Sequence, residues 1–295
     1  MGRDYLVGSG ETNSGNPLNY TVVLAVLAAG LIHAVWNAIA KGFHDQFVSF
    51  ALLNVGTGVM SLLAWPFVGL ARSSCWGYLG LSTACHLGYE LFLMSSYRRS
   101  DFSRSYPIAR GVAPLLVSVA GLVFASEHVS LRGTLGIVVV VLGILSLARR
   151  RGESSATRWA LLWALGTGVA IAAYTVIDGL GVRASQSAPR YAVALFAIQA
   201  SIWMVGVIIR RGRSWWPSAR TVSLGFFAGL LSMAAYAIVL WAQLRTPLGV
   251  VSALRETGVL WAAIIGALIF RERPLRQVVF PSLLVVLGVV LLSVA

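Results

Sequence analysis

Ten apolar segments divide this chain, and each is about as long as a membrane-crossing helix, which takes roughly 20 mostly apolar residues. Within each segment the apolar residues run continuously rather than alternating with polar ones, which excludes a transmembrane β-barrel. We therefore predict an all-α integral membrane protein with ten transmembrane helices joined by short loops. The segments are residues 20–40, 47–70, 76–97, 106–125, 131–148, 159–178, 191–209, 221–243, 249–270 and 275–294.

The composition agrees with this prediction. Of the 295 residues, 58% are hydrophobic and 11% are charged, and the mean hydropathy is +0.80. A soluble domain is about 45–50% apolar and about 25% charged. The composition therefore argues against a soluble globular enzyme, a disordered protein and a coiled coil.

The basic residues are unevenly distributed, although the net charge of +13 taken alone would suggest a nucleic-acid partner. Of the 23 lysines and arginines, 15 lie in loops on one side of the predicted bundle and 6 on the other, while Arg110 and Arg255 lie inside segments. An excess of Lys and Arg marks the cytoplasmic side of a membrane protein. We therefore predict a multi-pass protein of the cell (inner or plasma) membrane, with both termini away from the cytoplasm, in contact with lipid and with no nucleic-acid partner.

The chain is predicted to consist of two halves. Residues 1–19 form a polar tail without the features of a cleaved signal peptide, and a basic loop, 149–158, joins five segments in 20–148 to five in 159–295.

The two halves contain related sequences. Residues 109–143 align with 254–288 at an offset of 145, which pairs Arg110 with Arg255. Two further matches pair Trp36 with Tyr174 and Tyr89 with Tyr236. Because each half has an odd number of segments, the halves have opposite orientations, and such inverted repeats are typical of alternating-access carriers. A duplication retained only for structure is the alternative.

Several motifs together resemble EamA-type members of the drug/metabolite transporter superfamily. The resemblance implies a ten-helix secondary carrier or exporter of small metabolites, but it names no substrate, because the superfamily transports amino acids, purines, drugs and sugar phosphates. The termini of eukaryotic relatives are described as cytosolic, which is opposite to the charge distribution here. The motifs are HAVWNAIAK (33–41), YPIARGVAPLL (106–116), Glu127, AAYTVIDGLGVR (172–183) and PLGVVSALRETGVLWAAIIGALIFRER (247–273).

Polar residues inside the first segment share one helical face. His33, Trp36 and Asn37 follow the i, i+3, i+4 spacing. Such a face suits the wall of a substrate cavity. The alternative is that His33 and Asn37 only bind a neighbouring helix.

The third segment carries His86, Tyr89 and Glu90 on one face. Ionisable residues inside a membrane are rare and are candidates for function. A buried carboxyl group favours its neutral form, so we predict proton coupling at Glu90 and His86. The alternative is a Glu that pairs with an Arg or His only for packing.

The paired residues Arg110 and Arg255 are predicted to bind an anionic substrate between the halves, because a guanidinium group binds carboxylate or phosphate in a planar fork. Tyr89, Tyr174 and Tyr236 would contribute ring faces or hydroxyl groups. Two alternatives are that the arginines reach out to the lipid headgroups, and that Glu256 neutralises Arg255.

The remaining acidic residues are expected to be structural. Asp178 is expected at an interfacial helix end, and Glu127 and Glu272 are expected to cap the following helix or to pair with loop arginines. Small residues every four positions, at Gly258, Ala262 and Gly266, would let helices pack closely or form a homodimer.

Three classes of function are compatible with a ten-helix protein. The first is a secondary transporter, which we expect to export a small polar or anionic metabolite, with multidrug or cation efflux as the alternative. The second is an intramembrane enzyme, but the chain has no metal, nucleophile or cofactor-binding motif, so we expect no catalysis and no cofactor. The third is a membrane subunit that transports nothing. Cys75 and Cys85 lack the spacing of a disulfide framework or a zinc site.

Overall fold

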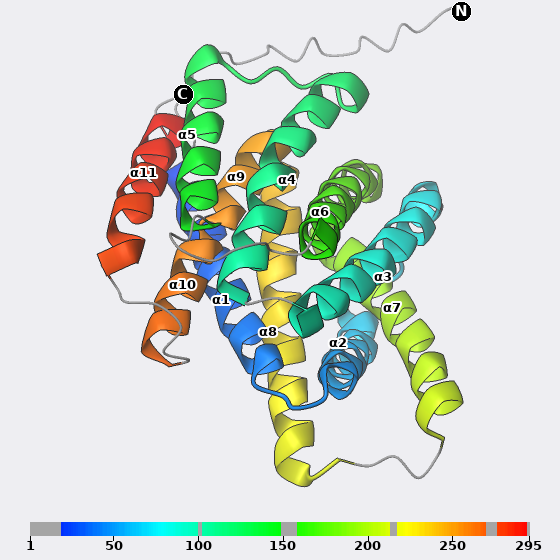
Figure 1. The fold of residues 1–295 in the computed structure, drawn as a ribbon. Coiled ribbons are helices and arrows are strands. Elements are labelled where there is room, and N and C mark those ends of the chain that lie inside the picture. Colours follow the sequence, from blue (N-terminus) through cyan, green and yellow to red (C-terminus); the bar gives the residue numbers. More distant parts are fainter. Residues whose placement is uncertain (1–18, 100–101, 149–157, 213–216, 270–275, 294–295) are drawn as a thin grey trace, which may run out of the picture.

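The structure is a computed structural model that describes residues 19–99, 102–148, 158–212, 217–269 and 276–293, and all regular structure in these ranges is helical (Figure 1). The helices are α1 (Tyr20–Lys41), α2 (Gln46–Val68), the short 3-10 helix η1 (Ser73–Cys75), α3 (Trp76–Arg99), α4 (Phe102–Phe124), α5 (Leu131–Ala148), α6 (Arg158–Ser185), α7 (Ala188–Arg211), α8 (Ala219–Gln243), α9 (Leu248–Glu256), α10 (Gly258–Leu268) and α11 (Arg276–Ser293). We call residues 20–148 the first half and 158–293 the second half.

The predicted segments coincide with these helices, with two differences. The segment 249–270 is occupied by α9 and α10, which meet at Thr257. The sixth segment was predicted to end at Asp178, whereas α6 continues to Ser185.

The lengths and compositions of the described helices support a membrane protein. Five helical stretches are long and apolar enough to span a membrane, and they lie in α1, α2, α6, α7 and α8. Shorter apolar stretches lie in α4, α5 and α11. The all-α fold is thus confirmed for the described residues, while the number of ten spans stays a prediction.

Capping residues set several helix ends. The Asp45 side chain accepts a hydrogen bond from the backbone N–H of Phe47 at 2.9 Å, which starts α2, and Ser187 caps α7 in the same way. Gly212 follows α7 with a φ of +72°, a conformation that glycine adopts without a steric penalty.

The two halves pack against each other along most of their helices. Helix α5 packs on α11, α2 on α7 and α4 on α9, while α1 packs on α8 and α3 on α6. The backbones of α1 and α10 meet at Gly30 and Gly258, where a Cβ atom on Gly258 would lie 2.5 Å from the carbonyl oxygen of Gly30. Apolar side chains are already solvated by lipid, so helix association in a membrane depends on such close packing of small residues.

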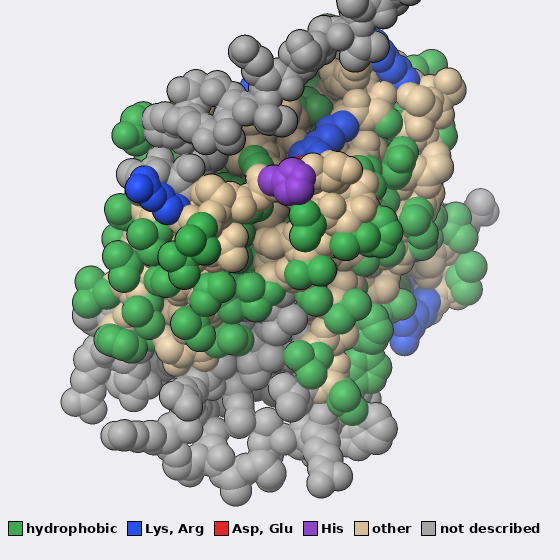
Figure 2. All heavy atoms as spheres, turned by 90° about the horizontal axis from the view of Figure 1, so that it is seen from above, with side chains coloured by type: hydrophobic (Ala, Val, Ile, Leu, Met, Phe, Trp, Pro, Cys, Tyr) green, Lys and Arg blue, Asp and Glu red, His purple; other side chains and the backbone are tan. Residues whose placement is uncertain are grey.

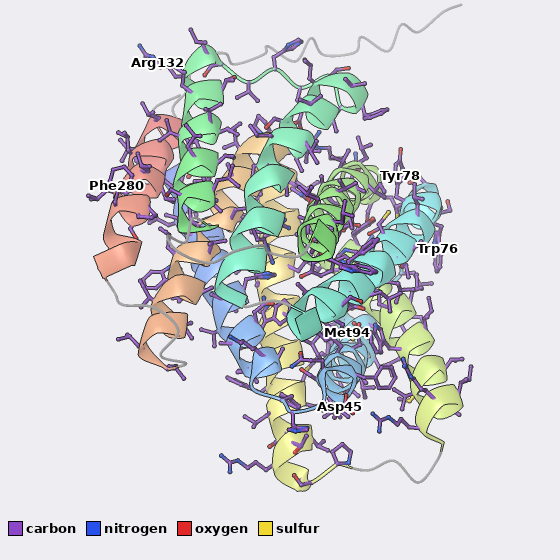
Figure 3. The ribbon with its side chains drawn as sticks, in the orientation of Figure 1. Asp45, Trp76, Tyr78, Met94, Arg132 and Phe280 are labelled. Atoms are coloured by element: carbon purple, nitrogen blue, oxygen red, sulfur yellow. The ribbon has the colours of Figure 1, made fainter. Side chains whose placement is uncertain are left out.

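The outside of the bundle is largely apolar. Phe67 and Ile209 are 90% and 80% exposed, and hydrophobic side chains cover much of the described surface in the end view (Figure 2). Trp76 and Phe280 also lie on the outside (Figure 3). This surface suits contact with lipid chains, whereas the polar side chains described below are buried.

Candidate functional site

A cavity lies between the two halves. Helices α1, α2 and α3 of the first half and α6, α7, α8 and α9 of the second half contribute to its wall. The lining residues are His33, Trp36, Phe50, Leu53, Asn54, His86, Tyr89, Glu90, Tyr174, Phe196, Gln199, Ser232, Tyr236 and Arg255. The cavity therefore combines ionisable side chains with aromatic walls, as ligand pockets commonly do.

Eight of the ten residues predicted as substrate-binding or proton-coupling line this cavity. They are His33, Trp36, His86, Tyr89, Glu90, Tyr174, Tyr236 and Arg255. The other two, Asn37 and Arg110, are buried but are not among its lining residues. These eight residues therefore lie together around one cavity, and their roles stay predictions.

Asn37 and His33 interact within their own helix. The Asn37 amide donates to the backbone carbonyl oxygen of His33 at 2.8 Å, and the Trp36 indole N–H donates to Nδ1 of His33 at 3.1 Å. Nε2 of His33 contacts the guanidinium group of Arg110 on α4. His33 therefore connects the cavity wall to the buried charges behind it.

Arg110 and Arg255 share one counter-ion. Arg110 donates from Nη1 to both carboxylate oxygens of Glu256 at 3.0 Å, and Arg255 donates to Oε1 of Glu256 at 3.1 and 2.9 Å. The arginines are only 2% and 3% exposed, so the expectation that they reach the lipid headgroups is wrong. Removing one partner of a buried ion pair is costly because it leaves the other charge without a partner in the interior. Arg110, Arg255 and Glu256 together carry a net charge of +1, and of these three residues only Arg255 lines the cavity.

Glu90 is held by two neutral donors. The amide of Asn54 on α2 donates to Oε1 at 2.9 Å, and the indole N–H of Trp203 on α7 donates to Oε2. Among the described residues, both hydrogen-bond donors to this carboxyl group are uncharged. The expectation of a Glu paired with Arg or His is therefore not met. Sequence reasoning missed Asn54 and Trp203, although Asn54 is a polar residue in the apolar run FALLNVG.

Asp178 is fully buried rather than interfacial. Its carboxylate accepts hydrogen bonds from the hydroxyl groups of Tyr191, at 2.8 Å, and Tyr236, and lies 3.1 Å from Nε2 of His86. The sequence suggested a helix end at Asp178-Gly179. The helix instead continues to Ser185, and side chains of α3, α7 and α8 contact the carboxylate.

Aromatic rings surround the middle of the cavity. The ring of His86 stacks on Tyr174 with centroids 3.9 Å apart, and Tyr89 meets Tyr174 edge-on at 5.5 Å. The guanidinium carbon of Arg255 lies 5.9 Å from the Tyr174 ring centroid. This distance permits a cation–π interaction.

Glu127 joins the two halves at one end of the bundle. It pairs with Arg183 of α6 and accepts a hydrogen bond from the backbone N–H of Leu248 at 2.8 Å, so it caps α9 rather than the helix that follows it. Arg183 also donates to the carbonyl oxygen of Gln243 at 3.2 and 3.1 Å. The expected pairing with an arginine is confirmed for Glu127, whereas Glu272 lies outside the described residues.

The two cysteines are free, and the described residues hold no group of three or more His, Cys, Asp or Glu suited to a metal ion. Burial raises the pKa of the Cys75 thiol, so this side chain stays protonated and packs as a small apolar group.

Comparisons with known proteins agree with the motifs. Residues 158–294 match the family described as the EamA-like transporter family. This match and the apolar helices of the described residues support a membrane transporter, and the match confirms, over residues 158–294, the resemblance inferred from the motifs.

Two further proteins are similar to the chain. Multidrug resistance protein EbrB of Bacillus subtilis (strain 168) is 28% identical over 91 residues, which cover 31% of this chain and 68% of EbrB. A solved structure described as "Crystal structure of protein" has a TM-score of 0.74 at 17% identity and covers 92% of this chain and 96% of its own. The second similarity concerns the fold alone.

Proposed function

We propose that this chain is a secondary transporter that exports a small polar or anionic metabolite by alternating access between two inverted five-helix repeats. The observation that carries the proposal is the cavity, because both halves line it and because it brings Arg255, Glu90 and several aromatic rings together. We place the transporter in the plasma or inner membrane.

The packing of the helices supports the inverted repeat. If α6 is the counterpart of α1, and α8 that of α3, the α1–α8 contact and the α3–α6 contact are equivalent. The contacts α2–α7, α4–α9 and α5–α11 each join a helix to its own counterpart. An approximate twofold axis between the halves produces this pattern.

Two donors support a substrate that carries a hydrogen-bond acceptor or a negative charge. Arg255 supplies a guanidinium group at the cavity wall, and together with Arg110 and Glu256 it carries a net charge of +1. Gln199 also lines the cavity, and its buried side-chain nitrogen has no hydrogen-bond partner in the described part of the chain. A bound carboxylate, phosphate or carbonyl group would satisfy it.

Replacing Arg255 with Gln is expected to lower the transport of an anionic probe about tenfold, because a charge-assisted hydrogen bond contributes about 1.5–3 kcal/mol. The measurement is uptake of labelled glutamate, aminoethylphosphonate and tetraphenylphosphonium into proteoliposomes. Arg245→Gln is the matched control, because this exposed arginine lies over Trp241 outside the cavity. Equal anion uptake by both variants would contradict the substrate class.

Cation efflux is the second candidate function. Glu90 within an aromatic cavity is suited to an organic cation, and the similar protein EbrB is named a multidrug resistance protein. Transport of tetraphenylphosphonium but neither anion would favour this candidate. Transport of none of the three probes would favour a subunit that transports nothing.

The side of entry is proposed from contacts at the end that holds Glu127. In addition to the Glu127–Arg183 pair, Arg72 donates to Gln186 at 2.7 Å across the halves there. The opposite end, where the basic loops lie, has the Asp45–Arg211 pair. We propose that the cavity is closed at the Glu127 end and is reached from the cytoplasm, which suits export.

Replacing Glu127 with Gln removes the ion pair with Arg183 and is therefore expected to increase the fraction of time for which the cavity is open at the Glu127 end. A cysteine placed at Ser232 in the cavity, with Cys75 and Cys85 replaced by Ala, reports access to a membrane-impermeant maleimide. We expect labelling from the Glu127 side of oriented vesicles to become about tenfold faster, the effect of losing about 1.4 kcal/mol. Arg132→Gln, an exposed change at the same end, is the control. Unchanged labelling would show that the ion pair does not hold this end closed.

A further inference from the structure

The surroundings of Asp178 differ from those of the other buried carboxylates. Its three hydrogen-bonding partners come from three helices, namely His86 on α3, Tyr191 on α7 and Tyr236 on α8. The tyrosines offer neutral hydroxyl groups. Among the three partners, His86 is the one whose side chain can take up a proton and become a cation, the imidazolium.

Other titratable or charged groups face this pair. On α3, Glu90 lies one turn from His86, and Cys85 precedes it. The ring of Tyr174 on α6 covers the imidazole. Tyr174 also interacts with the buried charges of Arg110 on α4 and of Arg255 and Glu256 on α9. The thiol of Cys75 in η1 lies near Tyr191.

The pair is also connected to the cavity. His86 and Tyr236 both line the cavity, whereas Asp178 and Tyr191 are not among its lining residues. A ligand that accepts a hydrogen bond from the Tyr236 hydroxyl group removes one hydrogen-bond donor from the Asp178 carboxylate. The carboxylate then has more capacity to balance a positive charge on His86.

We infer that His86 and Asp178 form a proton-binding site, separate from Glu90, that senses the cavity through Tyr236. A proton from water in the cavity adds to Nδ1, the ring nitrogen of His86 that does not contact Asp178, and the Asp178 carboxylate balances the resulting imidazolium. The connection to substrate depends on the proposed transport function, but the proton site itself does not.

The proton site can be tested without a substrate. Protein with [15N]histidine in lipid nanodiscs is titrated by NMR from about pH 5 to about pH 9, and His86→Gln assigns the His86 signals. We expect His86 to change protonation in this range and its midpoint to be displaced by about one pH unit or more in Asp178→Asn. A His86 that keeps one state throughout, or a midpoint that Asp178→Asn leaves in place, would overturn the site.

The connection to the cavity is tested in proteoliposomes with the same three probes. The readout is the ratio of uptake driven by a pH gradient to exchange of labelled for unlabelled probe. We expect this ratio to fall about tenfold or more in Asp178→Asn and Tyr236→Phe, within the usual range of coupling between sites. Tyr191→Phe is the matched variant, because it removes one donor from the same carboxylate at a position outside the cavity lining.

Each result has a separate meaning. If Tyr191→Phe lowers the ratio as much as Tyr236→Phe, or if neither tyrosine variant nor Asp178→Asn lowers it, the connection through Tyr236 is wrong. A wild-type protein that transports none of the probes would overturn the proposed function and this connection, while the NMR titration still decides the proton site.

Discussion

Replacing Glu256 with Gln is expected to lower the free energy of unfolding by about 3–5 kcal/mol, the usual effect of removing one partner from a buried ion pair. In this chain the effect falls on two cations, because Arg110 and Arg255 both use Glu256. The amide of Gln accepts hydrogen bonds but carries no charge. Two guanidinium groups would then repel each other in the interior.

The measurement is thermal or denaturant unfolding of the purified protein in detergent. A variant that also replaces Arg110 with Met is expected to recover part of the loss, because only one cation then lacks a partner. Arg245→Gln, on the exposed end of the bundle, should change stability by less than about 1 kcal/mol. A Glu256→Gln protein as stable as wild type would show that the shared carboxylate does not stabilise the bundle.

Replacing Glu90 with Gln is expected to reduce uptake driven by a pH gradient to the background level. Gln has nearly the same shape and can still accept a hydrogen bond from Asn54, but it cannot take up and release a proton. The cavity would then keep its form while losing one charge that depends on pH.

This result is measured as accumulation of the labelled probes in proteoliposomes with an imposed pH gradient. The amount of protein in the membrane and its thermal stability serve as controls for folding. Gradient-driven uptake at the wild-type level would remove Glu90 from the coupling mechanism.

The helices and the cavity were predictable because they depend on local patterns. Uninterrupted apolar runs determine helices in lipid, since every backbone hydrogen bond must be made inside the segment. The i, i+4 spacing of His86 and Glu90 placed both on one face, and both line the cavity. Such patterns need no knowledge of how distant helices cross.

The pairing of charges was not predictable, because it depends on those crossings. Asp178 beside Gly179 has the sequence of a helix end, and only packing brings Tyr191 and Tyr236 to it. Asn54 and Trp203 meet Glu90 from two other helices, with no spacing in the sequence that connects them.

The internal repeat predicts that Arg110 and Arg255 have equivalent surroundings in the two halves. At the offset of 145, Arg110 aligns with Arg255, but Glu256 aligns with Gly111. One half therefore supplies the carboxylate for both arginines. The arginines were expected to act as equivalents, whereas the chemistry of their neighbours differs between the repeats.

The backbone contact between Gly30 and Gly258 limits which positions of this molecule can be substituted. A β-carbon on Gly258 would overlap the opposite backbone, so the crossing point tolerates almost no variation. Most of the residues that line the cavity lie on helices other than α1 and α10. A library that varies the residues of the cavity should therefore leave both glycines untouched.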